Sequence, residues 1–289
     1  MSNIEKYTEA LMKRILSIQD ISCLGKCSLT VALPIISAMG IEAVVMPTAV
    51  LSTHTMFKGF TFRDLTDDML PIAEHWKKEN IGFDAIYTGY LGSFEQLDIC
   101  RSIFNEFARC DNTIFIDPVM GDNGRLYTGF DHEFAKAMAG LCGLADVIVP
   151  NMTEASYMLD IPYRERYDRA YSETVLKKLA ELGAKKAVIT GIRLEEGKTG
   201  FIGYDREKDE FFDYFHELLP VSFHGTGDIY ASCTVGALMR GLGLRDALKL
   251  AADYTYDCIR VTLNDQKAVK YGVNFEEALP GLIDRLRNI

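Results

Sequence analysis

Apolar, β-prone runs alternate with segments of helical spacing along this chain, and that alternation constrains the fold more than any other feature. Short strand patterns occur at residues 15–19, 43–51, 83–91, 113–116, 147–149 and 187–190. Helical patterns separate them, over residues 28–39, 64–78, 94–110 and 171–182. Strands that alternate with helices in this way predict an α/β fold with a doubly wound, mostly parallel sheet flanked by helices.

The C-terminal part of the chain has a different pattern. Residues 200–215 predict a hairpin that turns at residues 205–208, and residues 244–263 and 274–286 predict closing helices. Residues 122–129 hold no apolar pattern and predict a small exposed flap. No Pro/Gly/Ser-rich linker divides the sequence, so we expect a single domain over residues 1–289.

Composition excludes several kinds of partner. The chain has 31 Lys and Arg against 41 Asp and Glu, a net charge of −10, and no basic block, so nucleic acid and anionic membranes are poor partners. The longest apolar stretch, residues 30–51, is interrupted by Pro34, Glu42 and Pro47 and predicts core, not a membrane span. Seven scattered cysteines without a C-x-x-C pair predict reduced thiols in a cytoplasmic protein.

The clearest chemical signal is a glycine turn made by Gly225, Thr226, Gly227 and Asp228. It lies between a β-prone run and a helical segment, which predicts a strand, a tight turn and a helix. The two glycines allow backbone N–H groups to point into one concavity, where an anion can bind. Asp228 would repel a phosphate, but it is well placed to accept a proton from an attacking hydroxyl. The alternative is a plain helix entry, with an acid that the helix dipole favours.

Polar side chains follow several of the predicted strands, at the edge where open α/β sheets bind ligands. They include Thr55, Asp117 and Asp122. Asn151 and Glu154 follow a further strand with the spacing of a helix capping box, so these two residues also have a purely structural explanation.

Four features together resemble the ribokinase-like superfamily: the turn at residues 225–228, the run at residues 117–122, the Asn151/Glu154 pair and the first strand with its Ile18-Gln19 end. The run at residues 88–93 is similar to the vitamin B6 branch, the pyridoxal/pyridoxamine kinases. The resemblance extends from about residue 15 to about residue 241. It implies ATP-dependent phosphorylation of the 5′-hydroxymethyl group of pyridoxal, pyridoxine or pyridoxamine.

The resemblance also implies individual roles. Asp228 would be the general base, and the N–H groups of Gly225, Thr226 and Gly227 would stabilise the transferring phosphoryl group. An unperturbed Asp titrates near ~4 and is a weak base, which is tolerable because the proton leaves late in a loose transition state. The remaining assignments are Asp117, Asn151, Glu154, Thr190 and Thr226 near ATP, Asp122 and Glu154 near Mg²⁺, and Thr55 and Tyr90 against the pyridine ring.

Asp20 departs from the family pattern, which usually has serine after Ile-Gln in the first strand. A carboxylate here can pair with a pyridinium N–H or with the amine of pyridoxamine, so we expect Asp20 to bind substrate and to favour pyridoxamine over pyridoxal. The alternative is an exposed loop acid, since residues 20–26 predict a polar loop.

Other functions stay open. The resemblance implies a homodimer, and it leaves open a requirement for a monovalent cation such as K⁺. A hydroxymethylpyrimidine kinase of thiamin synthesis has the same fold and glycine-aspartate turn. A non-catalytic vitamin- or nucleotide-binding protein of this fold is the third alternative, although it would gain little from Asp228 beside bound phosphate.

Overall fold

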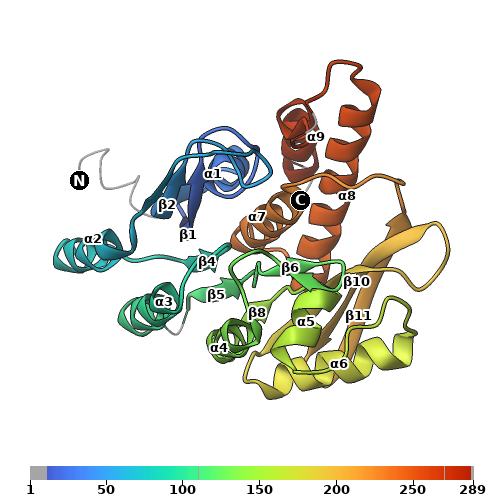
Figure 1. Cartoon of the computed structure of the whole chain (residues 1–289), viewed down its shortest axis with the longest axis horizontal. Coiled ribbons are helices and arrows are strands. Elements are labelled where there is room, and N and C mark those ends of the chain that lie inside the picture. The colour runs from blue at the N-terminus through green and yellow to red at the C-terminus, as the bar shows by residue number, and fades with distance from the viewer. Residues whose placement is uncertain (1–11, 110, 270, 288–289) are drawn as a thin grey trace, which may run out of the picture.

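A computed structural model describes residues 12–109, 111–269 and 271–287 (Figure 1). Its main sheet has nine strands in the order β11-β10-β9-β8-β5-β4-β1-β2-β3. The parallel strands are β1 (Arg14–Ser22), β2 (Glu42–Leu51), β4 (Ala85–Thr88), β5 (Thr113–Ile116), β8 (Val147–Ile148) and β9 (Lys186–Ile192). Antiparallel strands complete the two edges, namely β3 (Phe62–Asp64), β10 (Lys198–Asp205) and β11 (Glu210–Glu217). The predicted doubly wound, mostly parallel sheet is confirmed.

Helices cover both faces of this sheet, because successive side chains of each strand point to opposite faces and both sets are apolar. On β1, Ile15 packs with one helical layer and Leu16 with the other. The first layer contains α1 (Leu29–Ala38), α7 (Thr226–Met239), α8 (Leu244–Asn264) and α9 (Phe275–Arg287). The second contains α2 (Thr66–Lys78), α3 (Phe94–Phe107), α4 (His132–Cys142), α5 (Met152–Met158) and α6 (Arg169–Glu181).

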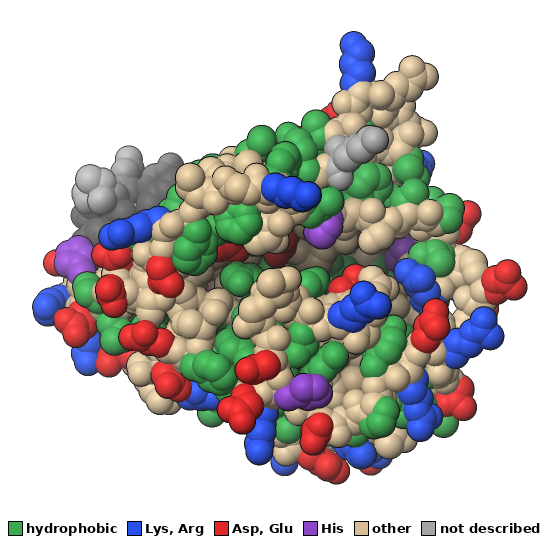
Figure 2. Space-filling view, viewed as in Figure 1, with side chains coloured by type: hydrophobic (Ala, Val, Ile, Leu, Met, Phe, Trp, Pro, Cys, Tyr) green, Lys and Arg blue, Asp and Glu red, His purple; other side chains and the backbone are tan. Residues whose placement is uncertain are grey.

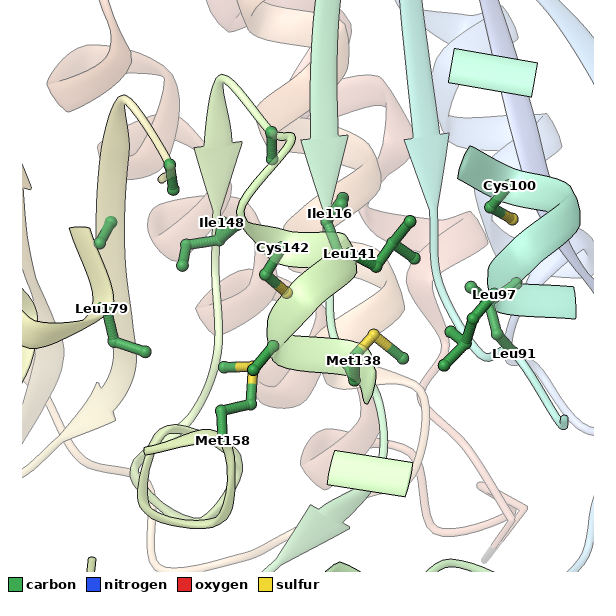
Figure 3. Packing of buried hydrophobic residues seen from close by; sticks show 14 of the residues in the cluster. Leu91, Leu97, Cys100, Ile116, Met138, Leu141, Cys142, Ile148, Met158 and Leu179 are labelled. Atoms are coloured by element: carbon green, nitrogen blue, oxygen red, sulfur yellow. The ribbon is translucent and has the colours of Figure 1, made fainter. Parts of the chain in front are cut away.

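Figure 3 shows how the second layer closes on the sheet, with Leu141 of α4 beside Ile116 of β5 and Leu97 of α3 further to the right in the same layer. All three side chains are fully buried. Burial of one such side chain contributes about 1.5–3 kcal/mol. This packing holds the parallel strands in register and so fixes where their carboxyl ends lie.

Several local predictions were wrong. Residues 62–64 form the edge strand β3, where the sequence predicted that a helix begins at residue 64. Asp20 belongs to β1 and not to a polar loop. The predicted flap, in contrast, is confirmed: it is a small hairpin of β6 (Gly121–Asp122) and β7 (Arg125–Leu126). The connection between β11 and α7 spans residues 218–225, so it is longer than a tight turn.

Two predictions about the whole chain concern membranes and thiols. Across the described ranges every helix is too short or too polar to cross a lipid bilayer. The cysteines within these ranges are free thiols, and Cys110 lies outside the described residues.

The sheet changes its winding direction between β1 and β4. From β1 the chain passes through α1 to β2 on one side, and it then returns to place β4 and β5 on the other side. A crevice opens at such a switch point, outside the carboxyl ends of the strands, and open α/β sheets bind ligands there. Asp20 near the end of β1, Tyr90 after β4 and Asp117 after β5 all lie at this edge.

Candidate active site

The glycine turn forms the N-terminus of α7, as predicted. Gly225 is the N-cap, with a φ of +81°, and no side chain caps it. A Cβ at this position would lie 2.1 Å from the Lys26 carbonyl oxygen, so both the backbone conformation and the close approach require glycine. The first N–H groups of a helix have no partner within it. The turn therefore presents free amide donors and the positive end of the helix dipole to an anion.

Asp228 lies in the first turn of α7, beside these amides. Burial raises the pKa of Asp228 to about 7, and the charge of Asp20 contributes in the same direction. A hydrogen bond from the backbone N–H of Ser28 opposes this rise in pKa. Ser28 has a φ of +52°, an uncommon conformation for a residue with a Cβ. The sequence analysis assumed an unperturbed pKa near ~4 for Asp228. The raised pKa corrects that assumption.

Asp20 is buried, at 5% exposure, so the interpretation of Asp20 as an exposed loop acid is wrong. The pairing of β1 with β2 changes register between Gln19 and Ile21, which is a bulge-like irregularity centred on Asp20. The Ser22 hydroxyl donates to Asp20 Oδ2 at 3.0 Å. Burial raises the pKa of Asp20, and hydrogen bonds from Ser28 and Ser22 together with the charge of His54 oppose the rise.

Thr55 and Tyr90 were the two residues expected against the substrate ring, and the structure brings Tyr90 close to Asp20. Tyr90 is partly buried, interacts with the Asp20 charge, and has its ring 5.5 Å from that of Phe130. Thr55 is exposed on the loop after β2. Its neighbour His54 is the buried residue of that loop, at 6% exposure.

His54 is a site residue that the sequence assignments missed. The backbone N–H of Met56 donates to its Nδ1 at 3.1 Å, so Nε2 carries the proton and donates to the Tyr271 carbonyl at 3.1 Å. Its ring stacks on that of His224, with centroids 5.6 Å apart, next to the glycine turn. An imidazole at the carboxyl end of a strand was visible in the sequence, but its partners lie far away along the chain.

Two further carboxylates lie deeper in the site. Asp117 follows β5, and burial together with the charge of Asp228 raises its pKa well above the usual range. Glu154 of α5 accepts hydrogen bonds from Asn151 N at 2.8 Å and Met120 N at 3.2 Å. Burial and the charge of Asp117 nevertheless raise the pKa of Glu154. The carboxylates thus interact in series, from Asp20 through Asp228 and Asp117 to Glu154.

Asn151 forms the predicted capping box with Glu154. Its Nδ2 also donates to the Gly121 carbonyl at 2.8 Å, which ties the β6–β7 hairpin to α5. Asp122 is exposed on this hairpin, where both carboxylate oxygens accept hydrogen bonds from Asn123. Thr190 of β9 forms an isolated parallel β-bridge with Asn151. Asp122, Asn151, Glu154 and Thr190, which were predicted to lie near the nucleotide or the metal, are therefore on adjacent elements, whereas Thr226 is the first residue of α7.

The buried carboxylates of the site bear on whether it can hold a divalent cation. Within the described part of the chain, no three His, Cys, Asp or Glu side chains form a ready metal site. Mg²⁺ characteristically takes only one or two protein carboxylates and completes its shell with phosphates and water. Buried carboxylates that raise one another's pKa suit such a partial site. Figure 2 shows a hollow across the face of the molecule that is turned toward the viewer, with acidic and histidine side chains along it.

The open α/β sheet, the glycine-lined start of α7 and the acid beside it define a ribokinase-like fold. The sequence profile of the family described as phosphomethylpyrimidine kinase matches residues 32–273. The chain belongs to this family. The resemblance to ribokinase-like proteins, and within them to pyridoxal kinases, is confirmed by the relatives described next.

Individual relatives extend the comparison. Pyridoxal kinase PdxY of Rubrobacter xylanophilus is 27% identical over 263 residues, which cover 86% of this chain and 87% of the relative. The crystal structure of pyridoxal kinase from Lactobacillus plantarum is 30% identical, with a TM-score of 0.87 and coverage of 96% and 99%. A Bacteroides thetaiotaomicron protein, provisionally described as a phosphomethylpyrimidine kinase and crystallised with pyridoxal, is 41% identical, with a TM-score of 0.89 and coverage of 94% and 96%.

The two glycines of the turn give a matched pair of variants. We expect Gly225→Ala to lower the free energy of unfolding by about 2 kcal/mol or more, because a Cβ is costly at positive φ and the Lys26 backbone must move. Gly227→Ala should change it by less than about 0.5 kcal/mol, since a Cβ there meets no atom within 4 Å. Urea unfolding measures both values. Equal effects of the two variants would contradict this account of the turn.

Proposed function

We propose that this protein transfers the γ-phosphoryl group of ATP to the 5′-hydroxymethyl group of a vitamin B6 vitamer. The observation that carries the proposal is one carboxylate, Asp228, whose pKa is raised to about 7 beside the free amides of the glycine turn. A general base is most effective when its pKa lies near the working pH. Membership of a kinase family and the likeness to pyridoxal kinases support this choice of reaction.

In the proposed reaction, the oxygen of the substrate hydroxyl bonds to the γ-phosphorus of ATP, and Asp228 accepts the proton of that hydroxyl. The bond between the γ-phosphorus and the β,γ-bridging oxygen breaks, and ADP leaves. The N–H groups of Gly225, Thr226 and Gly227 then stabilise the charge that the phosphoryl oxygens carry. Because the transition state of phosphoryl transfer is loose, most of the catalysis comes from positioning and from charge stabilisation. A base with a pKa near neutrality is sufficient for the remaining proton transfer.

The nucleotide would lie against Asp117, Asn151, Glu154, Thr190 and Thr226, at the end of the site opposite Asp20. Asp122 and Glu154 would hold Mg²⁺ together with the phosphates, since both supply the oxygen ligands that this ion prefers. When bound, Mg²⁺ offsets the negative charge of the phosphates. The buried charges on Asp117 and Glu154 give this end of the site a need for a cation.

A phosphomethylpyrimidine substrate is the second candidate, and the family description favours it. The charges at the substrate end of the site oppose it. Asp20 and Asp228 face that end, and Lys26 on the adjoining loop is already paired with Glu276 at 2.8 Å and Asn274 at 3.2 Å. The phosphate of a phosphorylated substrate would therefore be repelled by these carboxylates, and Lys26 would not be free to offset the repulsion. An uncharged or cationic alcohol would not be repelled.

A substrate panel tests the proposal directly. ADP release would be measured with ATP and Mg²⁺, with and without K⁺, for pyridoxal, pyridoxine, pyridoxamine, hydroxymethylpyrimidine and its monophosphate. We expect turnover of at least one B6 vitamer with a higher kcat/KM than for either pyrimidine. A preference for the pyrimidine monophosphate would replace the proposal with the family's named activity. Binding of a vitamer without ADP release would favour a non-catalytic protein.

Loss of the base should affect the rate more than binding. We expect Asp228→Ala to lower kcat by about 10²–10⁴-fold with a modest change in ligand affinity. In the wild type, the raised pKa means that Asp228 gains a proton as the pH falls through about 7, so activity should decline about tenfold per pH unit well below that value. Asp246→Ala is the matched control, an exposed acid in the first turn of α8. Full activity of Asp228→Ala would end the assignment of this base.

The buried position of Asp20 sharpens the prediction about vitamer preference. Burial disfavours the ionised form of the Asp20 carboxyl group, and a cationic amine bound beside Asp20 would favour that form. We expect Asp20→Ser to lower the ratio of kcat/KM for pyridoxamine to that for pyridoxal by about tenfold, the effect of one modest charge interaction. Asp20→Asn, which keeps the size and removes the charge, should do the same. If neither variant changes the ratio, Asp20 does not select the amine.

A further inference from the structure

A small group of buried polar side chains lies between the sheet and α7, the helix that carries Asp228. Ser17 and Gln19 come from β1, Tyr87 from β4 and Ser232 from α7, and all four are completely buried. We refer to these four residues as the polar column. None of them has a role in the proposed reaction, although they lie in the layer between the sheet and the helix that carries the base.

Strand register and helix periodicity bring the column together. Ser17 pairs with Tyr87 across β1 and β4, and Gln19 lies two residues further along on the same face. Gln19 packs so closely on Gly89 that a Cβ there would lie 2.8 Å from its Cδ. Ser232 follows Asp228 by four residues, so it lies one helical turn below the carboxylate on the same side of α7.

The hydrogen bonding of the column is incomplete. Gln19 Nε2 donates to Ser17 Oγ at 2.8 Å. Gln19 Oε1, Tyr87 Oη and Ser232 Oγ are buried and make no hydrogen bond of normal geometry with any part of the chain that the structure describes. Burial of unpaired polar atoms costs free energy that apolar side chains would avoid. These three oxygens therefore need an explanation other than stability.

Tyr87 supplies the link to the base. Its hydroxyl is close to the side chains of Ser232 and Gln19, and the negative charges of Asp117 and Asp228 contribute to the raised pKa of Tyr87. Polar groups held beneath a carboxylate in a dry environment can stabilise its anionic form in place of water. Of the other groups that interact with Asp228, the Ser28 N–H also stabilises its anionic form, through a hydrogen bond. Asp20 and Asp117 are acids, whose negative charges disfavour that form, and the Cys27 thiol and the Tyr127 hydroxyl also interact with Asp228.

We propose that Tyr87 and Ser232 are positioning residues for the Asp228 carboxylate, which their hydroxyl dipoles stabilise from the interior of the protein. This inference rests on the proposed function, because it assigns the two hydroxyls a role only through the base. The direction of the effect follows from burial. Desolvation raises the pKa of Asp228, the hydroxyl dipoles oppose that rise, and their removal should raise the pKa further.

The test is the pH dependence of kcat/KM for the best B6 vitamer of the substrate panel. The acidic limb is the part of this profile in which activity falls as Asp228 gains a proton. We expect Tyr87→Phe to move it upward by roughly half to one pH unit, the size of the loss of one hydroxyl dipole near a carboxylate. Activity near pH 6 should then fall about three- to tenfold relative to the wild type, while the plateau above pH 8 changes less than about twofold. A KM that stays constant across the plateau would separate this effect from lost substrate binding.

Tyr254→Phe is the matched control. Tyr254 is also fully buried, but its hydroxyl donates to the Phe275 carbonyl at 3.1 Å, in the packing of α8 against α9. Tyr254→Phe should lower stability without moving the acidic limb. Ser232→Ala removes a single hydroxyl and should shift the limb in the same direction as Tyr87→Phe. It also provides the test if Tyr87→Phe does not fold.

Two outcomes distinguish the failures. If the wild type phosphorylates a vitamer but Tyr87→Phe and Ser232→Ala keep its acidic limb within about 0.2 pH unit, the positioning role is wrong and the proposed function stands. If the wild type phosphorylates no vitamer on the panel, the proposed function fails, and this role fails with it.

Discussion

The approach of Gly225 to the Lys26 carbonyl is the contact on which the rest of the site depends. It joins the start of α7 to the loop between β1 and α1, two segments at opposite ends of the chain. The same loop continues to Ser28, whose backbone N–H is hydrogen-bonded to Asp228. Lys26 and Ser28 both have positive φ values, at +51° and +52°. One strained loop thus positions both the amides that can bind an anion and the acid beside them, as strained segments at active sites often do.

The charges of the site determine what it can bind. Asp20, Asp228, Asp117 and Glu154 interact in series, and burial raises the pKa of each of them. Such an arrangement is costly until a cation or a proton compensates it. The described residues form no complete metal site by themselves. In the proposed function, Mg²⁺ bound together with the nucleotide phosphates would supply positive charge beside these carboxylates.

The sequence predicted the sheet well because strands buried on both faces leave continuous apolar runs. The prediction for residues 113–116 matches β5 at both ends. The glycine turn was also predictable, since two glycines beside an acid constrain the local backbone. Asp20 was harder to interpret, because its burial depends on a register change against β2 and not on its neighbours in sequence. The stack of His54 on His224 joins two loops far apart in the chain, and no local pattern reports such a contact.

The raised pKa of Asp228 could not be predicted from neighbouring residues in the sequence either, because it depends on contacts between distant segments. A sequence indicates that an acid follows two glycines, but its proton affinity depends on how much protein surrounds it and on which charges that protein carries. Here the charge that raises the pKa comes from Asp20 on β1, the hydrogen bond that opposes the rise comes from Ser28, and the dipoles that we propose come from β4 and α7. Apolar residues in place of Tyr87 and Ser232 would avoid the cost of burying unpaired hydroxyls but would remove the dipoles that we propose for the carboxylate. The buried hydroxyls are consistent with a fold that gives up some stability where it needs an ionised base.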